Sequence, residues 1–100
     1  MPVSQKFDNE NNKLLITITG AFIFSENKGF RNAYKNITPD RKLDVSVDLK
    51  HIDYMDSAAL GMLLLLDEHF KEQRINILNC SDYVKKILDT VNFSKKFNIS

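Results

Sequence analysis

One stretch decides the fold of this chain: Tyr54-Met55-Asp56-Ser57-Ala58-Ala59-Leu60-Gly61-Met62, with the leucines that follow it. An acidic residue and a serine come directly before an apolar segment. Such residues are typical of a helix N-terminus, because their side-chain oxygens accept hydrogen bonds from backbone N–H groups that the helix leaves unpaired. The alternating segment ahead of it, Leu43–Leu49, predicts a strand with one buried face. We therefore expect a strand, a loop over Lys50–Asp56 and a helix over residues 57 to about 73.

The predicted helix separates into two sides when it is drawn at about 100° per residue. The core side is apolar, with Leu60 and Met62 on its flanks, and consists of Ala59, Leu63, Leu66 and Phe70. The second side faces solvent or a partner and consists of Ser57, Gly61, Leu64 and Glu68. Leu64 and Leu65 lie outside the core side, so either a neighbouring loop covers them or they belong to a partner surface.

Length and composition indicate one domain over residues 1–100, since 100 residues with 43% hydrophobic residues can build a single core. The net charge of +1 supplies no field that attracts nucleic acid or anionic lipid. The longest apolar run, Ala58–Leu66, is too short to cross a membrane, and the N-terminus lacks the apolar core of a secretion signal. The only cysteine, Cys80, is expected to be a buried free thiol. We therefore expect a cytoplasmic protein that uses neither nucleic acid nor membrane as a partner.

The remaining elements follow from turn and cap residues. We expect a hairpin of strands Val3–Phe7 and Leu14–Thr19, where Gly20 ends the second strand, and a helix that Ser25 caps. A strand over Ile75–Leu78 and a last helix, capped by Ser81 or Asp82, complete the order β-β-α-β-α-β-α. Phe93 and Phe97 are expected to fold the tail back onto the core. The predicted class is α/β (α+β), with a mixed four- to five-stranded sheet that carries its helices on one face.

The loop at the carboxyl end of a parallel strand is the usual position of a site in such sheets, and here that loop leads to Ser57. The N–H groups and partial positive charge of the helix N-terminus favour a phosphoryl group on this serine. From the residues alone, Ser57 is equally well a helix cap. Asp56 is interpreted as the structural cap, with positioning of the hydroxyl or of a kinase's metal ion as the alternative. His51 and His69 are interpreted as surface or packing residues, because no further metal ligand is spaced to join them.

The signature over residues 54–61, preceded by Val47-Asp48-Leu49, resembles that of STAS domains, the anti-anti-sigma factor (anti-sigma factor antagonist) family. Residues 20–25 resemble the family's approach to its first helix, and residues 79–81 and 91–93 resemble its last strand and helix. The resemblance covers essentially the whole chain and implies the STAS fold. Two positions depart from it: Ile23 stands where many members have an acidic residue, and Ala59 stands where many have glycine.

The resemblance implies a regulatory protein that is not an enzyme and needs no cofactor or metal. A serine kinase of the histidine-kinase-like ATPase type, which is also an anti-sigma factor, is expected to phosphorylate Ser57, and a PP2C-type phosphatase to reverse this. The unphosphorylated form then binds the kinase-like partner and the phosphorylated form is released. The expected partner-binding residues are Asp56, Ala58, Gly61, Leu64, Ile23 and Phe24.

Two other functions remain open from the sequence. The first is a hydrolase with Ser57 as nucleophile, but the glycines of a strained nucleophile elbow are missing around this serine. The second is a STAS subunit without a switch, which serves a larger assembly such as a lipid-transport complex.

Overall fold

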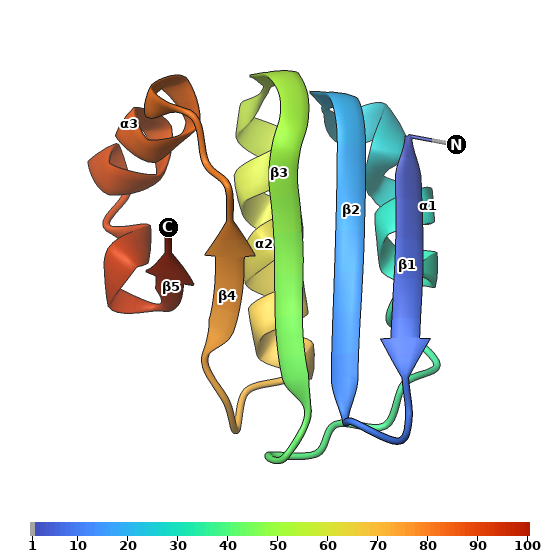
Figure 1. Ribbon diagram of the computed structural model, residues 1–100. Helices are drawn as coiled ribbons and strands as arrows, with labels where there is room; N and C mark the ends of the chain where they lie inside the picture. The colour runs from blue at the N-terminus through green and yellow to red at the C-terminus, as the bar shows by residue number, and fades with distance from the viewer. Residues whose placement is uncertain (1) are drawn as a thin grey trace.

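A five-stranded sheet with the order β1-β2-β3-β4-β5 organises the computed structural model, which describes residues 2–100 (Figure 1). β1 pairs antiparallel with β2, and the next three pairings are parallel. The expected α/β class with a mixed sheet is confirmed. The elements are β1 (Val3–Asp8), β2 (Lys13–Phe22), the 3-10 helix η1 (Phe24–Glu26), α1 (Asn27–Asn32), β3 (Asp44–Met55), α2 (Ser57–His69), β4 (Ile75–Leu78), α3 (Asp82–Thr90), the 3-10 helix η2 (Phe93–Lys95) and β5 (Phe97–Ile99).

The two faces of the sheet differ in polarity. Alternate residues of the central strands are buried beneath α1 and α2, which lie behind the sheet in Figure 1. The residues between them form a polar row on the other face, where the Asn76 side-chain N–H donates to Ser46 Oγ at 3.3 Å and that of Asn98 donates to Asn76 Oδ1 at 3.1 Å. The helices therefore attach to one face only, as the regular alternation of Leu43–Leu49 predicts.

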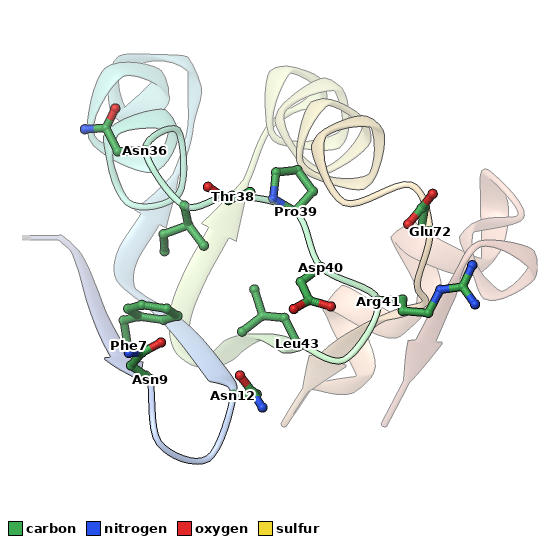
Figure 2. Close-up of a pocket in the computed structure, with 11 residues that line it drawn as sticks. Phe7, Asn9, Asn12, Asn36, Thr38, Pro39, Asp40, Arg41, Leu43 and Glu72 are labelled. Atoms are coloured by element: carbon green, nitrogen blue, oxygen red, sulfur yellow. The ribbon is translucent and has the colours of Figure 1, made fainter.

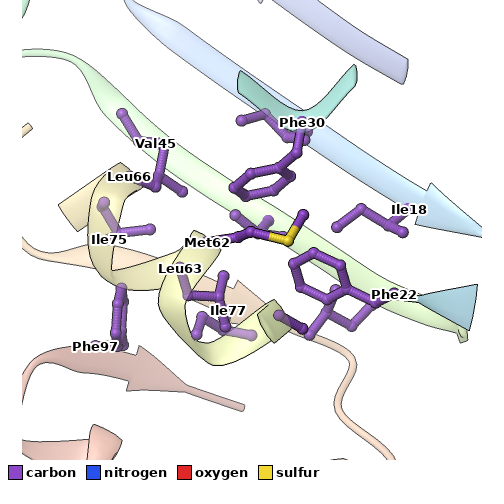
Figure 3. Close-up of a cluster of buried hydrophobic side chains, with 14 of the residues drawn as sticks. Ile18, Phe22, Phe30, Val45, Met62, Leu63, Leu66, Ile75, Ile77 and Phe97 are labelled. Atoms are coloured by element: carbon purple, nitrogen blue, oxygen red, sulfur yellow. The ribbon is translucent and has the colours of Figure 1, made fainter. Parts of the chain in front are cut away.

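The core lies between α2 and the sheet (Figure 3). The helix buries the side predicted for it, Ala59, Leu63 and Leu66, with Phe70 directly after its last residue. Met62, expected on the flank of this side, is buried as well. Met62 points toward the rings of Phe22 and Phe30, whose centroids lie 5.3 Å apart. This packing fixes the rotation of α2 about its axis, so the opposite side of the helix is held outward.

The expected loop over Lys50–Asp56 is wrong, because β3 continues to Met55. Two register shifts against β2 each insert an extra residue into β3. Bulges of this kind break the two-residue alternation, so the buried residues Leu49, Ile52 and Met55 are spaced by three. Gly20 does not end β2 either: it has a φ of 80° beside the second shift, and the strand runs on to Phe22.

Three further expectations needed correction. The first helix is short and divided into η1 and α1, and neither part receives a side-chain cap, so Ser25 is not a cap. The helix α2 ends at His69, earlier than the expected Gln73. Cys80 is half-buried, not fully buried.

The C-terminal tail folds back onto the core, as expected, and adds a strand that the predicted order lacked. Phe93 and Phe97 are buried with ring centroids 5.3 Å apart. β5 then pairs with β4. The Arg74 guanidinium holds this tail by donating to Asn98 Oδ1 at 2.7 Å and to the backbone oxygens of Ser94, Lys95 and Phe97.

Candidate functional site

The start of α2 is capped by Asp56, not by Ser57. The Asp56 backbone is extended, and its Oδ1 accepts a hydrogen bond from the Ala59 N–H at 3.0 Å. This is the standard N-cap contact, which satisfies a donor that the first turn leaves unpaired. Ser57 follows as the first helical residue, with an exposed side chain. Asp56 is therefore the helix cap, and the Ser57 hydroxyl is not needed to cap the helix.

Asp56 also joins α2 to a segment far away in the sequence. Its second oxygen, Oδ2, accepts from the Phe24 N–H at 3.1 Å, and its own N–H donates to the Phe22 carbonyl at 3.2 Å. β2 and β3 are neighbouring parallel strands, so their carboxyl ends deliver Phe22 and Met55 side by side. The Asp56 carboxylate bridges the two chain segments that leave this end of the sheet.

The surface around Ser57 is apolar and exposed. Phe24 is 68% exposed and Leu64 is 39% exposed, while Gly61 lies between Ser57 and Leu64 on the outer side of α2. Residues at these helical spacings share one side. We call the surface formed by Phe24, Asp56, Ser57, Gly61 and Leu64 the docking face.

The other two expected partner residues lie at the border of the docking face. Ala58 and Ile23 are half-buried, and Ile23 directly precedes η1. One further exposed apolar side chain of α2, Leu65 at 56%, lies beside Gly61 around the helix axis. Tyr54 is also exposed, at 53%, but it neighbours the buried Met55 in β3, so its side chain points to the sheet face opposite the helices.

The histidines are not placed to assist Ser57 as a nucleophile. Ser57 and His69 are the two ends of α2, about 18 Å apart along its axis. His69 Nε2 pairs with the Ile37 carbonyl at 2.9 Å, and its ring packs edge-on against Tyr34, with centroids 5.1 Å apart. His51 is exposed on β3, near the first register shift. His69 is thus a packing residue and His51 a surface residue, as expected.

A cleft lies at the other end of the sheet (Figure 2). It has a volume of about 680 Å³ and opens between the β1–β2 turn and the segment that leads from α1 to β3. Phe7, Ile37 and Leu43 contribute its apolar lining. None of the expected partner residues lines it, and the surface around Ser57 is an exposed face on a helix.

Within residues 2–100, no helix is both long enough and apolar enough to cross a membrane. The described part of the chain also brings no three His, Cys, Asp or Glu side chains together in a way that would hold a metal ion.

Comparison of the sequence with known proteins found relatives over nearly its full length. The family model described as STAS domain matches residues 4–100. A STAS-domain containing protein of Pseudomonas aeruginosa (strain UCBPP-PA14) is 44% identical over 95 residues, which cover 91% of each chain.

Solved structures share the fold at low sequence identity. The anti-sigma factor antagonist SpoIIAA in its unphosphorylated form has a TM-score of 0.74 at 14% identity, covering 98% of this chain and 86% of that one. SpoIIAA of Bacillus in the phosphorylated form has a TM-score of 0.66 at 10% identity, covering 98% and 90%. An anti-sigma factor antagonist STAS domain from Rhodobacter sphaeroides has a TM-score of 0.55 at 17% identity, covering 77% and 84%. At these identities the likeness concerns the fold alone.

Proposed function

Because the chain belongs to the STAS domain family, we propose that it is a protein-binding module whose docking is switched by phosphorylation of Ser57. Unphosphorylated, it binds a kinase-like anti-sigma or regulatory partner of the histidine-kinase-like ATPase type through the docking face. Phosphorylated by that kinase, it is released, and a PP2C-type phosphatase restores binding. The protein catalyses nothing itself and acts in the cytoplasm, where ATP is available to the kinase as the phosphoryl donor.

One observation carries this proposal: Asp56 supplies the cap, while Ser57 stays exposed beside it. In a helix capped by the serine, the hydroxyl oxygen would be held against a backbone N–H and would not be free to face a kinase. Here the Ala59 N–H already has an acceptor at 3.0 Å, so the Ser57 hydroxyl can accept a phosphoryl group without the loss of a cap.

The position also suits the charge that phosphorylation adds. A phosphoserine carries roughly −1.5 to −2 charges near neutral pH. The first turn of α2 presents backbone N–H groups and a partial positive charge, which stabilise an anion there. The modified domain therefore stays folded, and the added charge acts on binding.

On the docking face the same charge opposes a partner. Phe24 and Leu64 expose apolar surface, which gains free energy when a partner covers it. A phosphoryl group at the edge of this surface must be desolvated or displaced when the partner binds, and it repels partner carboxylates. Phosphorylation of Ser57 therefore ends binding.

The test compares two baits that differ at one position. Ser57→Ala keeps the docking face uncharged, and Ser57→Asp adds a permanent negative charge. We expect Ser57→Ala to capture from the source cells a protein with a histidine-kinase-like ATPase domain, identified by mass spectrometry. We expect Ser57→Asp to lose it. The captured kinase and ATP should then add one phosphate to the unmodified protein, at Ser57.

The matched control is Ser81→Asp, since Ser81 is the N-cap of α3 and aspartate can replace it as a cap. This bait should capture the partner as the unmodified protein does. If Ser57→Ala and Ser57→Asp bind the partner equally well, the switch is refuted, and the domain is instead a non-switching STAS subunit of a larger assembly.

A further inference from the structure

The docking face is built from two chain segments, and one carboxylate connects them. Asp56 Oδ1 bonds to the Ala59 N–H inside α2 at 3.0 Å, and Asp56 Oδ2 bonds to the Phe24 N–H at the start of η1 at 3.1 Å. The first contact is local, three residues along the chain, and is supported by the whole packed helix. The second spans 32 residues and lies exposed to solvent.

The segment η1 has few other attachments. None of its three residues is buried, and among residues 2–100 Phe24 is the most exposed of the large apolar side chains, at 68%. The buried anchors are Phe22 before it and Phe30 after it. A short segment without buried side chains opens at low free energy, and its position depends on the hydrogen bonds at its ends.

We propose that η1 is a movable arm of the docking face, which the Asp56 carboxylate holds in the binding position and phosphate on Ser57 releases. This inference rests on the proposed function and adds a change of shape to the change of charge. The phosphoserine then acts twice on a partner: it charges the edge of the docking face, and it withdraws the Phe24 side chain from its binding position.

The release follows from the charges that meet at this point. A phosphoryl group on Ser57 is attached to the residue next to Asp56, and both anions are attracted to the N–H groups of the same helix turn. Repulsion between the phosphoryl group and the Asp56 carboxylate is relieved when the carboxylate turns away from Ser57, which breaks one of its two hydrogen bonds. The exposed bond to Phe24 opens first, because the Ala59 bond is part of a helix packed on the core.

Amide hydrogen exchange of the whole protein, followed by NMR, tests the arm without a partner. Asp56→Asn keeps one acceptor oxygen, which preserves the cap of α2, and removes the second, which holds Phe24. We expect the Phe24 amide to exchange about tenfold faster in this variant, the effect of one lost hydrogen bond, while the Ala59 amide is unchanged. Protein with phosphoserine incorporated at position 57 should show the same acceleration at Phe24.

A combined protein, with phosphoserine at position 57 and Asp56→Asn, sharpens the test. Because the arm is already released in Asp56→Asn, phosphate should add no further acceleration at Phe24. The matched control is Asp40→Asn, which alters a carboxylate that accepts from the Lys42 N–H at the opposite end of the sheet and should leave Phe24 unchanged.

Unchanged exchange at Phe24 in Asp56→Asn would show that the carboxylate does not hold the arm. Unchanged exchange in the phosphoserine protein would show that phosphate does not release it. If that protein still fails to capture the partner, the proposed switch stands and only the arm is refuted. If it captures the partner and also releases Phe24, the proposed function fails and the arm remains.

Discussion

The helices α2 and α3 start with the same kind of N-cap, but only the cap of α2 also bonds to a distant segment of the chain. Each begins after a side-chain oxygen that accepts from the N–H three residues on: Asp56 to Ala59 at 3.0 Å and Ser81 to Val84 at 3.2 Å. Only Asp56 has a second oxygen, and that oxygen reaches Phe24 on another segment. The cap is local chemistry common to both starts, whereas the tertiary bond of Asp56 assembles a docking face at α2.

Exposure alone does not distinguish the two helices. Leu64 on α2 is 39% exposed and Val91, directly after α3, is 40% exposed. If the docking face is specific, equal changes at these two positions have unequal effects. Leu64→Glu should lower the affinity for the partner captured by the Ser57→Ala bait at least about 100-fold, which corresponds to roughly 2.7 kcal/mol. Val91→Glu should leave that affinity within about twofold. Isothermal titration calorimetry measures both.

Leu64 and Val91 are exposed to the same extent, so the two changes should lower the free energy of unfolding by similar amounts, within about 0.5 kcal/mol of each other. Urea unfolding of the two variants verifies this before binding is compared. A loss of affinity in Val91→Glu as large as that in Leu64→Glu would mean that the partner covers both helices, and the contrast between α2 and α3 would not hold.

Removal of the two caps should lower the free energy of unfolding by different amounts. Ser81→Ala removes one local cap and should cost about 1 kcal/mol. Asp56→Ala removes the cap and also the bond to Phe24, so it should cost about 2 kcal/mol. The free energy of unfolding from urea titrations gives both values. Equal costs would show that the bond between Asp56 and Phe24 contributes nothing to the stability of the unmodified protein.

Features that depend on consecutive residues could be predicted from the sequence, whereas features that depend on contacts between distant segments could not. The outward side of α2, with Ser57, Gly61 and Leu64, was predicted correctly, because helical spacing is a property of consecutive residues. The strand Ile75–Leu78 was predicted for the same reason, and of the two predicted caps of the last helix, Ser81 and Asp82, the structure has Ser81. The family resemblance rests on such consecutive residues too.

The errors arose where distant segments decide the structure. The bulges of β3 depend on its register with β2, so the strand character of residues 50–55 was hidden by a broken alternation. η1 has no cap because its first N–H is satisfied by Asp56, 32 residues later, and not by Ser25. β5 consists of three residues that become a strand only by pairing with β4.

Cysteine reactivity probes the two helix starts with one reagent. Cys80 precedes the cap of α3, and burial raises the pKa of its thiol, although Lys85 acts in the opposite direction. The thiolate is the reactive form, so at pH 8 Cys80 should react with a disulfide reagent about tenfold more slowly in the folded protein than in urea. In a Cys80→Ala background, Ser57→Cys places a thiol on the exposed N-terminus of α2, which lowers a thiol pKa, and should react faster than Cys80. The opposite order would contradict the exposure assigned to Ser57.

The smallest expected effect concerns alanine substitutions inside the two helices, at Gly61 in α2 and at Lys85 in α3. Gly61 lies inside α2 on the docking face, and a Cβ added there would meet no atom within 4 Å. Gly61→Ala should therefore stabilise the protein by about 0.5–1 kcal/mol, because glycine loses more conformational freedom than alanine in a helix. Lys85→Ala, at an exposed position inside α3, should change stability by less than about 0.5 kcal/mol. Since the fold gains from alanine, a partner that approaches closely at position 61 gives a reason for glycine there, and Gly61→Ala should then weaken partner binding. If stability rises and affinity is unchanged, the docking face does not include the second turn of α2.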